Sequence, residues 1–178
     1  MKNRKLKNSE LNRKTIEQVK ATTKTPLILV LDNIRSLNNI GSVFRTADAF
    51  LVEKIYLCGI TAQPPHKDIQ KTALGATESV AWSYEEDTLA VVETLLQQGV
   101  EVWAVEQAEK ATFLNEFTPS SHKTTAFVLG NEVKGVQQSV IDLAGNVVEI
   151  PQEGVKHSLN IAVSAGVVCW DFYQKINA

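Results

Sequence analysis

Three segments of the chain combine polar side chains with glycine in patterns that could bind or activate a ligand. They are residues 33–50, 129–135 and 150–163, and each lies at the end of an apolar run typical of a strand. Ligands of open α/β sheets bind beyond the carboxyl ends of the strands. The residue types in these segments could supply an anion site, a proton acceptor and close approach of the backbone to a ligand.

The first segment begins with an asparagine-rich turn and continues as a helix that carries one arginine. At about 100° per residue, Arg45 lies roughly 140° from the apolar Ile40, and Gly41 lies one turn before it. Helical side chains lean toward the N-terminus, so the missing side chain at Gly41 would let Arg45 reach the free N–H groups of the first turn. This arrangement predicts a site for a phosphate or a developing oxyanion. The alternative is a solvated arginine on a helix that Asn38 or Asn39 merely caps.

The second segment, LGNEVKG, directly follows a β-prone apolar run. Gly130 and Gly135 allow tight turns and close approach to a ligand, and Glu132 places a carboxylate at the carboxyl end of the strand. The alternative is a hairpin-like loop without a binding role.

The third segment leads from a loop at residues 151–154 into a helix that opens with the polar residues Ser158 and Asn160. After Asn160 the helix is apolar or small around nearly its whole circumference, which predicts burial against both the sheet and a partner subunit. We interpret His157 as a capping or core histidine rather than a catalyst.

Several familiar sites are absent from the sequence. There is no G-x-G-x-x-G, HExxH, CxxC or GxSxG, and the glycine spacing of residues 130–135 is followed by Val136 where a phosphate-binding loop needs lysine. Cys58 and Cys169 lie inside apolar runs, which indicates buried thiols. We therefore expect no metal site and no nucleotide hydrolysis.

The elements that must position these segments alternate between strand and helix. Expected strands are residues 27–32, 54–58, 79–82, 100–105, 124–129 and 146–150, and expected helices include 67–74, 86–98, 136–143 and 158–173. A further helix at residues 9–20 should end before Pro26, and residues 106–123 receive no assignment. This order predicts an α/β fold with a six-stranded parallel sheet flanked by helices.

Composition places the chain among ordinary globular proteins, with 44% hydrophobic and 21% charged residues. No apolar run is long enough to cross a bilayer and residues 1–24 lack the apolar centre of a signal peptide, so we expect a cytoplasmic protein. Residues 1–24 hold eight basic and two acidic side chains, whereas the net charge of the chain is -2. This basic arm is either a solvated tail or an arm that contacts phosphates.

The three segments together resemble the SpoU/TrmH family of RNA ribose methyltransferases, within the SPOUT superfamily. The matching positions of the first motif are Asn39, Gly41, Arg45 and Ala47; those of the second are Gly130, Asn131, Glu132 and Gly135; those of the third are Ile150, Pro151, Gly154, Ser158, Leu159 and Asn160. Gln152 stands where the family usually has methionine.

The resemblance implies a C-terminal deep trefoil knot that holds S-adenosylmethionine, in a homodimer whose two subunits build each active site. Residues 25–178 would form the SPOUT methyltransferase domain, and residues 1–24 a basic, partly helical extension. The implied cofactor-binding residues are Gly130, Asn131, Ile150, Leu159 and Val105. The implied catalytic residues are Arg45, Asn39, Glu132, Ser158 and Asn160, without a metal.

The expected activity is transfer of a methyl group from S-adenosylmethionine to a ribose 2'-hydroxyl of tRNA or rRNA. We expect Arg45, supplied by the other subunit, to hold the adjacent phosphate, because arginine is a poor proton acceptor. Glu132 would accept the hydroxyl proton or orient Asn39 and Arg45. The alternatives are an RNA-binding protein of the same fold without transferase activity and a small-molecule-binding α/β domain unrelated to RNA.

Overall fold

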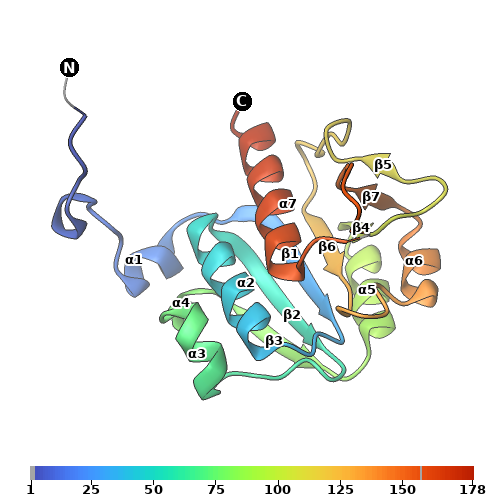
Figure 1. Cartoon of the computed structure of the whole chain (residues 1–178), viewed down its shortest axis with the longest axis horizontal. Helices are drawn as coiled ribbons and strands as arrows, with labels where there is room; N and C mark the ends of the chain where they lie inside the picture. The colour runs from blue at the N-terminus through green and yellow to red at the C-terminus, as the bar shows by residue number, and fades with distance from the viewer. Residues whose placement is uncertain (1–2, 157) are drawn as a thin grey trace.

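The computed structural model describes residues 3–156 and 158–178 and contains a seven-stranded parallel sheet flanked by helices (Figure 1). The strands are β1 (Thr25–Asp32), β2 (Val52–Cys58), β3 (Trp82–Glu85), β4 (Glu101–Val105), β5 (Thr112–Phe113), β6 (Thr125–Leu129) and β7 (Val147–Glu149). Their order across the sheet is β3-β2-β1-β6-β4-β7-β5. The predicted parallel α/β class is confirmed.

The central strands β1 and β6 are covered on both faces. Leu27, Leu29 and Leu31 of β1 pack into one apolar cluster, whereas Ile28 and Val30 pack into a second cluster on the opposite face. A strand buried on both faces needs a continuous apolar run rather than an alternating one. The apolar sequence of β1 therefore places this strand in the interior of the sheet, and the polar residues that follow it lie where the parallel strands have their carboxyl ends.

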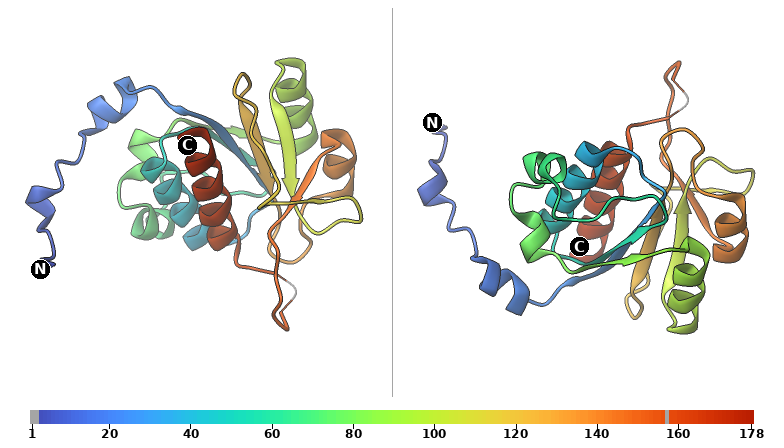
Figure 2. Two further views of the ribbon diagram at one scale, coloured as in Figure 1. Left: turned by 90° about the horizontal axis from the view of Figure 1, so that it is seen from above. Right: turned by 90° about the horizontal axis from the view of Figure 1, so that it is seen from below.

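Two layers of helices cover the sheet (Figure 2). One layer comprises α2 (Leu37–Ala49), α3 (Lys67–Ala73), α4 (Ala76–Ser79) and α7 (Ile161–Ile176), whose buried residues belong to the first cluster. The other comprises α5 (Thr88–Gln97) and α6 (Gln138–Ala144), which pack into the second cluster. The first polar segment leads from β1 into α2, and the third leads from β7 into α7. Because both helices lie in the same layer, these two segments lie on the same side of the sheet, at the carboxyl ends of the strands.

The sequence prediction of six strands was wrong by one. The additional strand is β5, which lies in the unassigned residues 106–123 and pairs with β7 at the edge of the sheet. Two residues are too few for a periodic pattern, so this strand depends on its tertiary pairing. The deep trefoil knot stays a prediction.

The third strand was also predicted too early in the chain. Residues 76–79 form the single-turn helix α4, in which the Ser79 hydroxyl donates to the Ala76 carbonyl at 3.2 Å. The strand β3 begins only at Trp82. A hydroxyl that bonds the backbone locally competes with strand pairing, which explains why Ser79 belongs to the helical turn rather than to the strand.

Residues 3–24 lie outside the layers of sheet and helices and extend away from them (Figure 1). They contain a 3-10 helix, η1 (Asn8–Glu10), and the short helix α1 (Ile16–Ala21), which has no buried residue. The predicted helix over residues 9–20 was too long at its start, because α1 begins only at Ile16; its end at Ala21 lies within one residue of the prediction, and Pro26 lies inside β1. No helix in the described part of the chain is long and apolar enough to cross a membrane.

Candidate active site at the carboxyl ends of the strands

A hollow of about 530 Å³ opens where β4, β6 and β7 end and α7 begins. Its volume lies in the range of small-molecule sites. Eight of the ten residues predicted for the site line it: Val105, Gly130, Asn131, Glu132, Ile150, Ser158, Leu159 and Asn160. Gln152, which replaces the usual methionine, also lines this hollow.

The start of α2 places Asn39 beside the hollow. The helix begins at Leu37, and the Ser36 hydroxyl accepts a hydrogen bond from the Asn39 amide at 3.3 Å. Ser36 is therefore the N-cap, and the suggestion that Asn38 or Asn39 caps this helix was wrong. Because the helix starts one residue before Asn38, the Asn39 side chain lies in the first turn and is free to bond elsewhere.

Glu132 joins the loop after β6 to the start of α2. Its Oε1 accepts hydrogen bonds from the Ser36 amide at 3.0 Å and from Asn39 Nδ2 at 3.1 Å, and its Oε2 accepts one from the Arg35 amide at 2.9 Å. Asn39 Oδ1 in turn accepts a hydrogen bond from Asn160 Nδ2 at 3.1 Å. One chain of hydrogen bonds thus connects all three polar segments.

These contacts change the acidity of Glu132. Burial by itself would raise the pKa of this carboxyl, but the hydrogen bonds from the Arg35 and Ser36 amides and from Asn39 outweigh burial and lower the pKa. A carboxylate that already holds three donors, with a lowered pKa, is a weak proton acceptor. The geometry therefore favours an orienting role for Glu132 over a role as general base.

The loop after β6 closes on itself. Asn131 and Gly135 form an antiparallel bridge, with the Gly135 amide donating to the Asn131 carbonyl at 2.8 Å. A Cβ on Gly130 would lie 2.1 Å from the Val136 nitrogen, and Gly135 has a φ of +69°. Both glycines are thus needed for the loop itself, which is hairpin-like and also lines the hollow.

The helix α7 begins three residues later than predicted. Asn160 is its N-cap, and its Oδ1 accepts a hydrogen bond from the Ala162 amide at 2.9 Å. Ser158 and Leu159 precede the helix as exposed residues at the rim of the hollow. The interpretation of His157 lies outside the described residues.

Arg45 does not lie with the other predicted residues. It is exposed and lines a second, shallower hollow together with Lys71 and Gly166, and none of the residues that the structure describes lines both hollows. The space beside Gly41 is filled by α3, because a Cβ there would lie 2.1 Å from Thr72 Oγ1. The prediction that Gly41 clears a path for Arg45 to the helix start was therefore wrong.

Sequence reasoning missed two carboxylates that hold the loop after β6. Asp32, at the end of β1, accepts from the Gln137 amide at 3.0 Å. Glu106, directly after β4, accepts from the Val136 amide at 3.2 Å. The available signal was an acidic residue at the carboxyl end of an apolar strand, which is where Asp32 stands.

The two cysteines are buried, as predicted, and are not joined to each other. Burial raises the pKa of both the Cys58 and the Cys169 thiol to about 12, so neither is available as a thiolate. In residues 3–156 and 158–178, no cluster of three or more His, Cys, Asp or Glu side chains could hold a metal ion.

The fold and the site define an α/β protein with a hollow of small-molecule size beside a polar cluster at the carboxyl ends of its parallel strands. The chain belongs to the SpoU rRNA Methylase family, whose model matches residues 26–170. It is 30% identical over 162 residues to the 23S rRNA (guanosine-2'-O-)-methyltransferase RlmB of Vibrio parahaemolyticus. That match covers 91% of this chain and 64% of the relative, so the chain spans less than two thirds of the relative's length.

Solved structures have the same fold. The TrmH/SpoU tRNA modifying enzyme of A. aeolicus superposes with a TM-score of 0.80 at 22% identity, covering 91% of this chain and 81% of that one. The SpoU methyltransferase AviRb of Streptomyces viridochromogenes, in complex with AdoMet, superposes with a TM-score of 0.77 at 20% identity, covering 89% and 64% of the two chains. The expected membership in the SpoU/TrmH family is confirmed.

Proposed function

We propose that the protein transfers a methyl group from S-adenosylmethionine to a ribose 2'-hydroxyl of RNA. The observation that carries this proposal is the hydrogen-bonded chain Glu132–Asn39–Asn160 at the edge of the 530 Å³ hollow. It joins three segments that are distant in sequence and that match the three motifs of the family. A protein that only bound RNA would have no need to hold these three side chains together beside a hollow of this size.

The hollow fits a cationic cofactor. Among the described residues that line it are three carboxylates, those of Glu106, Glu132 and Glu149, and one ammonium group, that of Lys134. The sulfonium of S-adenosylmethionine is positively charged, and an acidic lining attracts it. Gly130, Asn131, Ile150 and Leu159 would hold the cofactor, with Val105 at the end of β4. When bound, the cofactor supplies the methyl group that is transferred.

The chain's own residues then bind and orient the ribose. Glu132 fixes the Asn39 amide, and Asn39 fixes Asn160, so both amides are presented in one orientation. Ser158 lies at the same rim and can contact the sugar. Arg45 would clamp the phosphate next to the reacting hydroxyl, since a guanidinium binds phosphate oxygens with paired N–H groups.

A second copy of the chain would complete the site. Arg45 does not line the first hollow, and two apolar side chains of α7 are exposed, Val163 to 51% and Trp170 to 54%. Trp170 packs against Phe50 and Tyr173, so the exposed surface is a preformed apolar patch. An exposed apolar patch of this kind marks an interaction surface.

The dimer has a direct test. Trp170→Glu should convert a dimer into a monomer in analytical ultracentrifugation, because it places a charge in the apolar interface. The control is Leu143→Glu, an exposed apolar residue on α6 at the other face of the sheet, which should leave the dimer intact. A wild-type monomer at micromolar concentration would contradict the two-chain site.

The substrate is tRNA or rRNA, and the protein would act where these RNAs are found, in the cytoplasm. Relatives are named for both substrates, including an rRNA methyltransferase and a tRNA modifying enzyme. Incubation with labelled S-adenosylmethionine and total RNA from a deletion strain, followed by mapping of the mark, identifies the RNA and the nucleotide.

A thermal-shift measurement with S-adenosylhomocysteine separates the transferase from its rivals. Stabilisation by the ligand together with RNA labelling is the expected result. RNA binding without stabilisation would favour a binding protein of the same fold, and stabilisation without salt-dependent RNA affinity would favour a small-molecule-binding domain.

A further inference from the structure

Asp32 is a buried carboxylate beneath the site, at the carboxyl end of β1, and it is fully shielded from solvent. Its Oδ1 accepts hydrogen bonds from Thr88 Oγ1 at 2.7 Å, Gln137 Nε2 at 2.8 Å and Asn33 Nδ2 at 2.9 Å. Its Oδ2 accepts one from the Gln137 amide at 3.0 Å. A buried carboxylate needs such donors, and Asp32 has four of them.

The donors come from three separate segments. Thr88 is the first residue of α5, Asn33 begins the turn into α2, and Gln137 is the N-cap residue of α6. The α6 N-terminus has no side-chain cap of its own. Asp32 satisfies the Gln137 amide in its place, so this one carboxylate ties the end of the loop after β6 to the central strand of the sheet.

Asn33 extends this connection to the beginning of the same loop. It has a φ of +58°, its Oδ1 accepts from the Ile60 amide at 3.1 Å, and its Nδ2 donates to Asp32. With its side chain held at both ends, its backbone carbonyl accepts from Asn131 Nδ2 at 2.7 Å. Asn131 Oδ1 then accepts from the Val133 and Lys134 amides at 2.9 and 3.0 Å.

The loop that carries Glu132 is thus fastened on both sides of Glu132. Asp32 binds Gln137 directly on one side and holds Asn131 through Asn33 on the other. Glu132 lies between Asn131 and Gln137 in the chain. Its own contacts with Arg35, Ser36 and Asn39 form only while the loop keeps this position relative to the start of α2.

We propose that Asp32 is a positioning residue for methyl transfer, which sets the loop of residues 130–137 so that Glu132 can orient Asn39. The kinetic part of this inference rests on the proposed function, whereas the anchoring part does not. An error of about 1 Å in the placement of reacting groups can cost roughly 100-fold in rate, so a remote anchor of this kind affects the rate of the chemical step.

Asp32→Asn is the sharpest substitution, because it preserves shape and replaces one acceptor oxygen by an N–H₂ donor. All four groups that face Asp32 are donors, so the new amide would oppose at least one of them. Gln137→Ala is a milder second variant, since it removes one side-chain donor and leaves the backbone bond to Oδ2.

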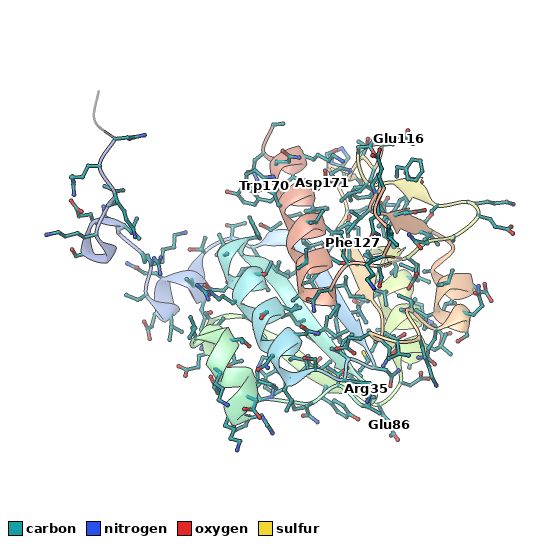
Figure 3. All side chains as sticks on the ribbon, in the orientation of Figure 1. Arg35, Glu86, Glu116, Phe127, Trp170 and Asp171 are labelled. Atoms are coloured by element: carbon teal, nitrogen blue, oxygen red, sulfur yellow. The ribbon has the colours of Figure 1, made fainter. Side chains whose placement is uncertain are left out.

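The matched control is Asp171→Asn on α7. Asp171 is a part-buried carboxylate that pairs with Lys175 at 2.8 Å, and it lies 11 residues beyond Asn160, roughly 16 Å along the helix. Figure 3 shows Asp171 toward the other end of the molecule from Arg35, which borders the site. The control makes the same chemical change and lowers stability without touching the loop.

The experiment measures amide hydrogen exchange and steady-state kinetics on the full-length variants. In Asp32→Asn we expect exchange at the Arg35, Ser36 and Gln137 amides to accelerate at least about tenfold, and kcat to fall by about tenfold or more with KM for RNA unchanged. Gln137→Ala should move both quantities in the same direction by less. Asp171→Asn should move neither after correction for global stability.

Two results overturn the proposal: exchange at these three amides that matches the control, or a kcat in Asp32→Asn no lower than in Asp171→Asn. If Asp32→Asn does not fold, Gln137→Ala decides in the same way. If wild-type protein transfers no methyl group while the exchange responds as expected, the proposed function fails and the anchoring by Asp32 stands.

Discussion

Glu132 is the residue whose state the structure defines most closely. Its hydrogen bonds to the Arg35 and Ser36 amides and to Asn39 exist only in the folded chain, and together they lower its pKa below the ordinary value of 4.5. A group with a lowered folded pKa contributes stability that is present above its unfolded pKa and is lost as the pH falls through the folded pKa. The contribution of Glu132 is therefore complete at neutral pH.

Glu132→Gln should lower the free energy of unfolding at pH 7 by about 1 kcal/mol, a value reduced from that of a buried charged hydrogen bond because Glu132 is exposed. The difference from wild type should shrink below about pH 4.5 and disappear once the wild-type carboxyl is protonated. Urea unfolding across pH 3–7 measures this, with the exposed Glu93→Gln on α5 as control. A difference that stays constant down to pH 3 would contradict the assigned hydrogen bonds.

Arg45→Ala should abolish methyl transfer while the affinity for S-adenosylhomocysteine is unchanged, because Arg45 lies outside the hollow predicted for the cofactor. Loss of one charged donor to a developing negative charge typically costs about 100-fold or more in rate. Arg45→Lys should recover part of the rate, since it keeps the charge but not the paired N–H groups. Retained methylation by Arg45→Ala would remove Arg45 from the site.

At the residue scale, the sequence predicted which side chains meet but not what holds them. Asn39, Glu132 and Asn160 could be named because they occupy motif positions of the family that the sequence resembles, in polar segments that follow predicted strands. Asp32 stands at the end of an apolar strand, where a site carboxylate could have been suspected, but its hydrogen-bond donors lie up to 105 residues away and no local pattern predicts them. The cap of α2 was misplaced for a related reason, since Ser36, Asn38 and Asn39 are all good N-cap residues.

At the scale of elements, the close packing of α2 on α3 depends on Gly41. An added Cβ would lie 2.1 Å from Thr72 Oγ1 and 2.2 Å from the Ile69 carbonyl oxygen, and the carbonyl cannot rotate away. Gly41→Ala should therefore lower the free energy of unfolding by about 1–3 kcal/mol, the usual cost of an overpacked contact.

Urea unfolding again measures the effect of Gly41→Ala. The neighbouring Ser42→Ala, which removes only the hydroxyl bonded to the Asn38 carbonyl, should change the free energy by less than about 0.5 kcal/mol. If the two variants are equally stable, α2 and α3 are not packed as closely as described.

The elements that were predicted well are those with a strong local signal. β1 is a continuous apolar run and α5 is amphipathic with an Asp87 cap, and both lie within two residues of their predicted bounds. β5 and α4 were missed because two and four residues are too few for a period. α7 begins three residues after its predicted start, because Ser158 and Leu159 precede its N-cap and line the hollow instead.

At the scale of the whole molecule, the two ends of β1 lead to different parts of the protein: the basic arm precedes its amino end, and the site follows its carboxyl end. The strand has eight residues, so the basic arm leaves the sheet roughly 26 Å from Asp32 and from the site above it. Arg45 faces outward on the layer formed by α2 and α7. One chain therefore carries an arm, an arginine and the proposed cofactor hollow in different places, an arrangement that agrees with the RNA substrate and the two-chain site proposed above.

The arm offers the last prediction. Among its residues 3–7 and 9–24 no side chain is fully buried, and Leu6, Leu11 and Ile16 are exposed to 53%, 39% and 37%. Deleting residues 1–24 should therefore cost little stability. If the arm contacts phosphates, the deletion should weaken RNA binding and reduce the slope of log K against log salt by several units, since each phosphate contact contributes about 0.7–0.9.

Because the arm starts far from the hollow, kcat at saturating RNA should not change, whereas KM for RNA should rise. A full-length variant with Lys5, Lys7, Arg13 and Lys14 replaced by glutamine is the matched control for charge, and it should reproduce much of the deletion. Equal salt slopes for wild type and deletion would identify the arm as a solvated tail. A fall in kcat would mean that the arm reaches the reacting nucleotide, which in this fold requires it to cross to the carboxyl edge of a sheet, its own or the partner's.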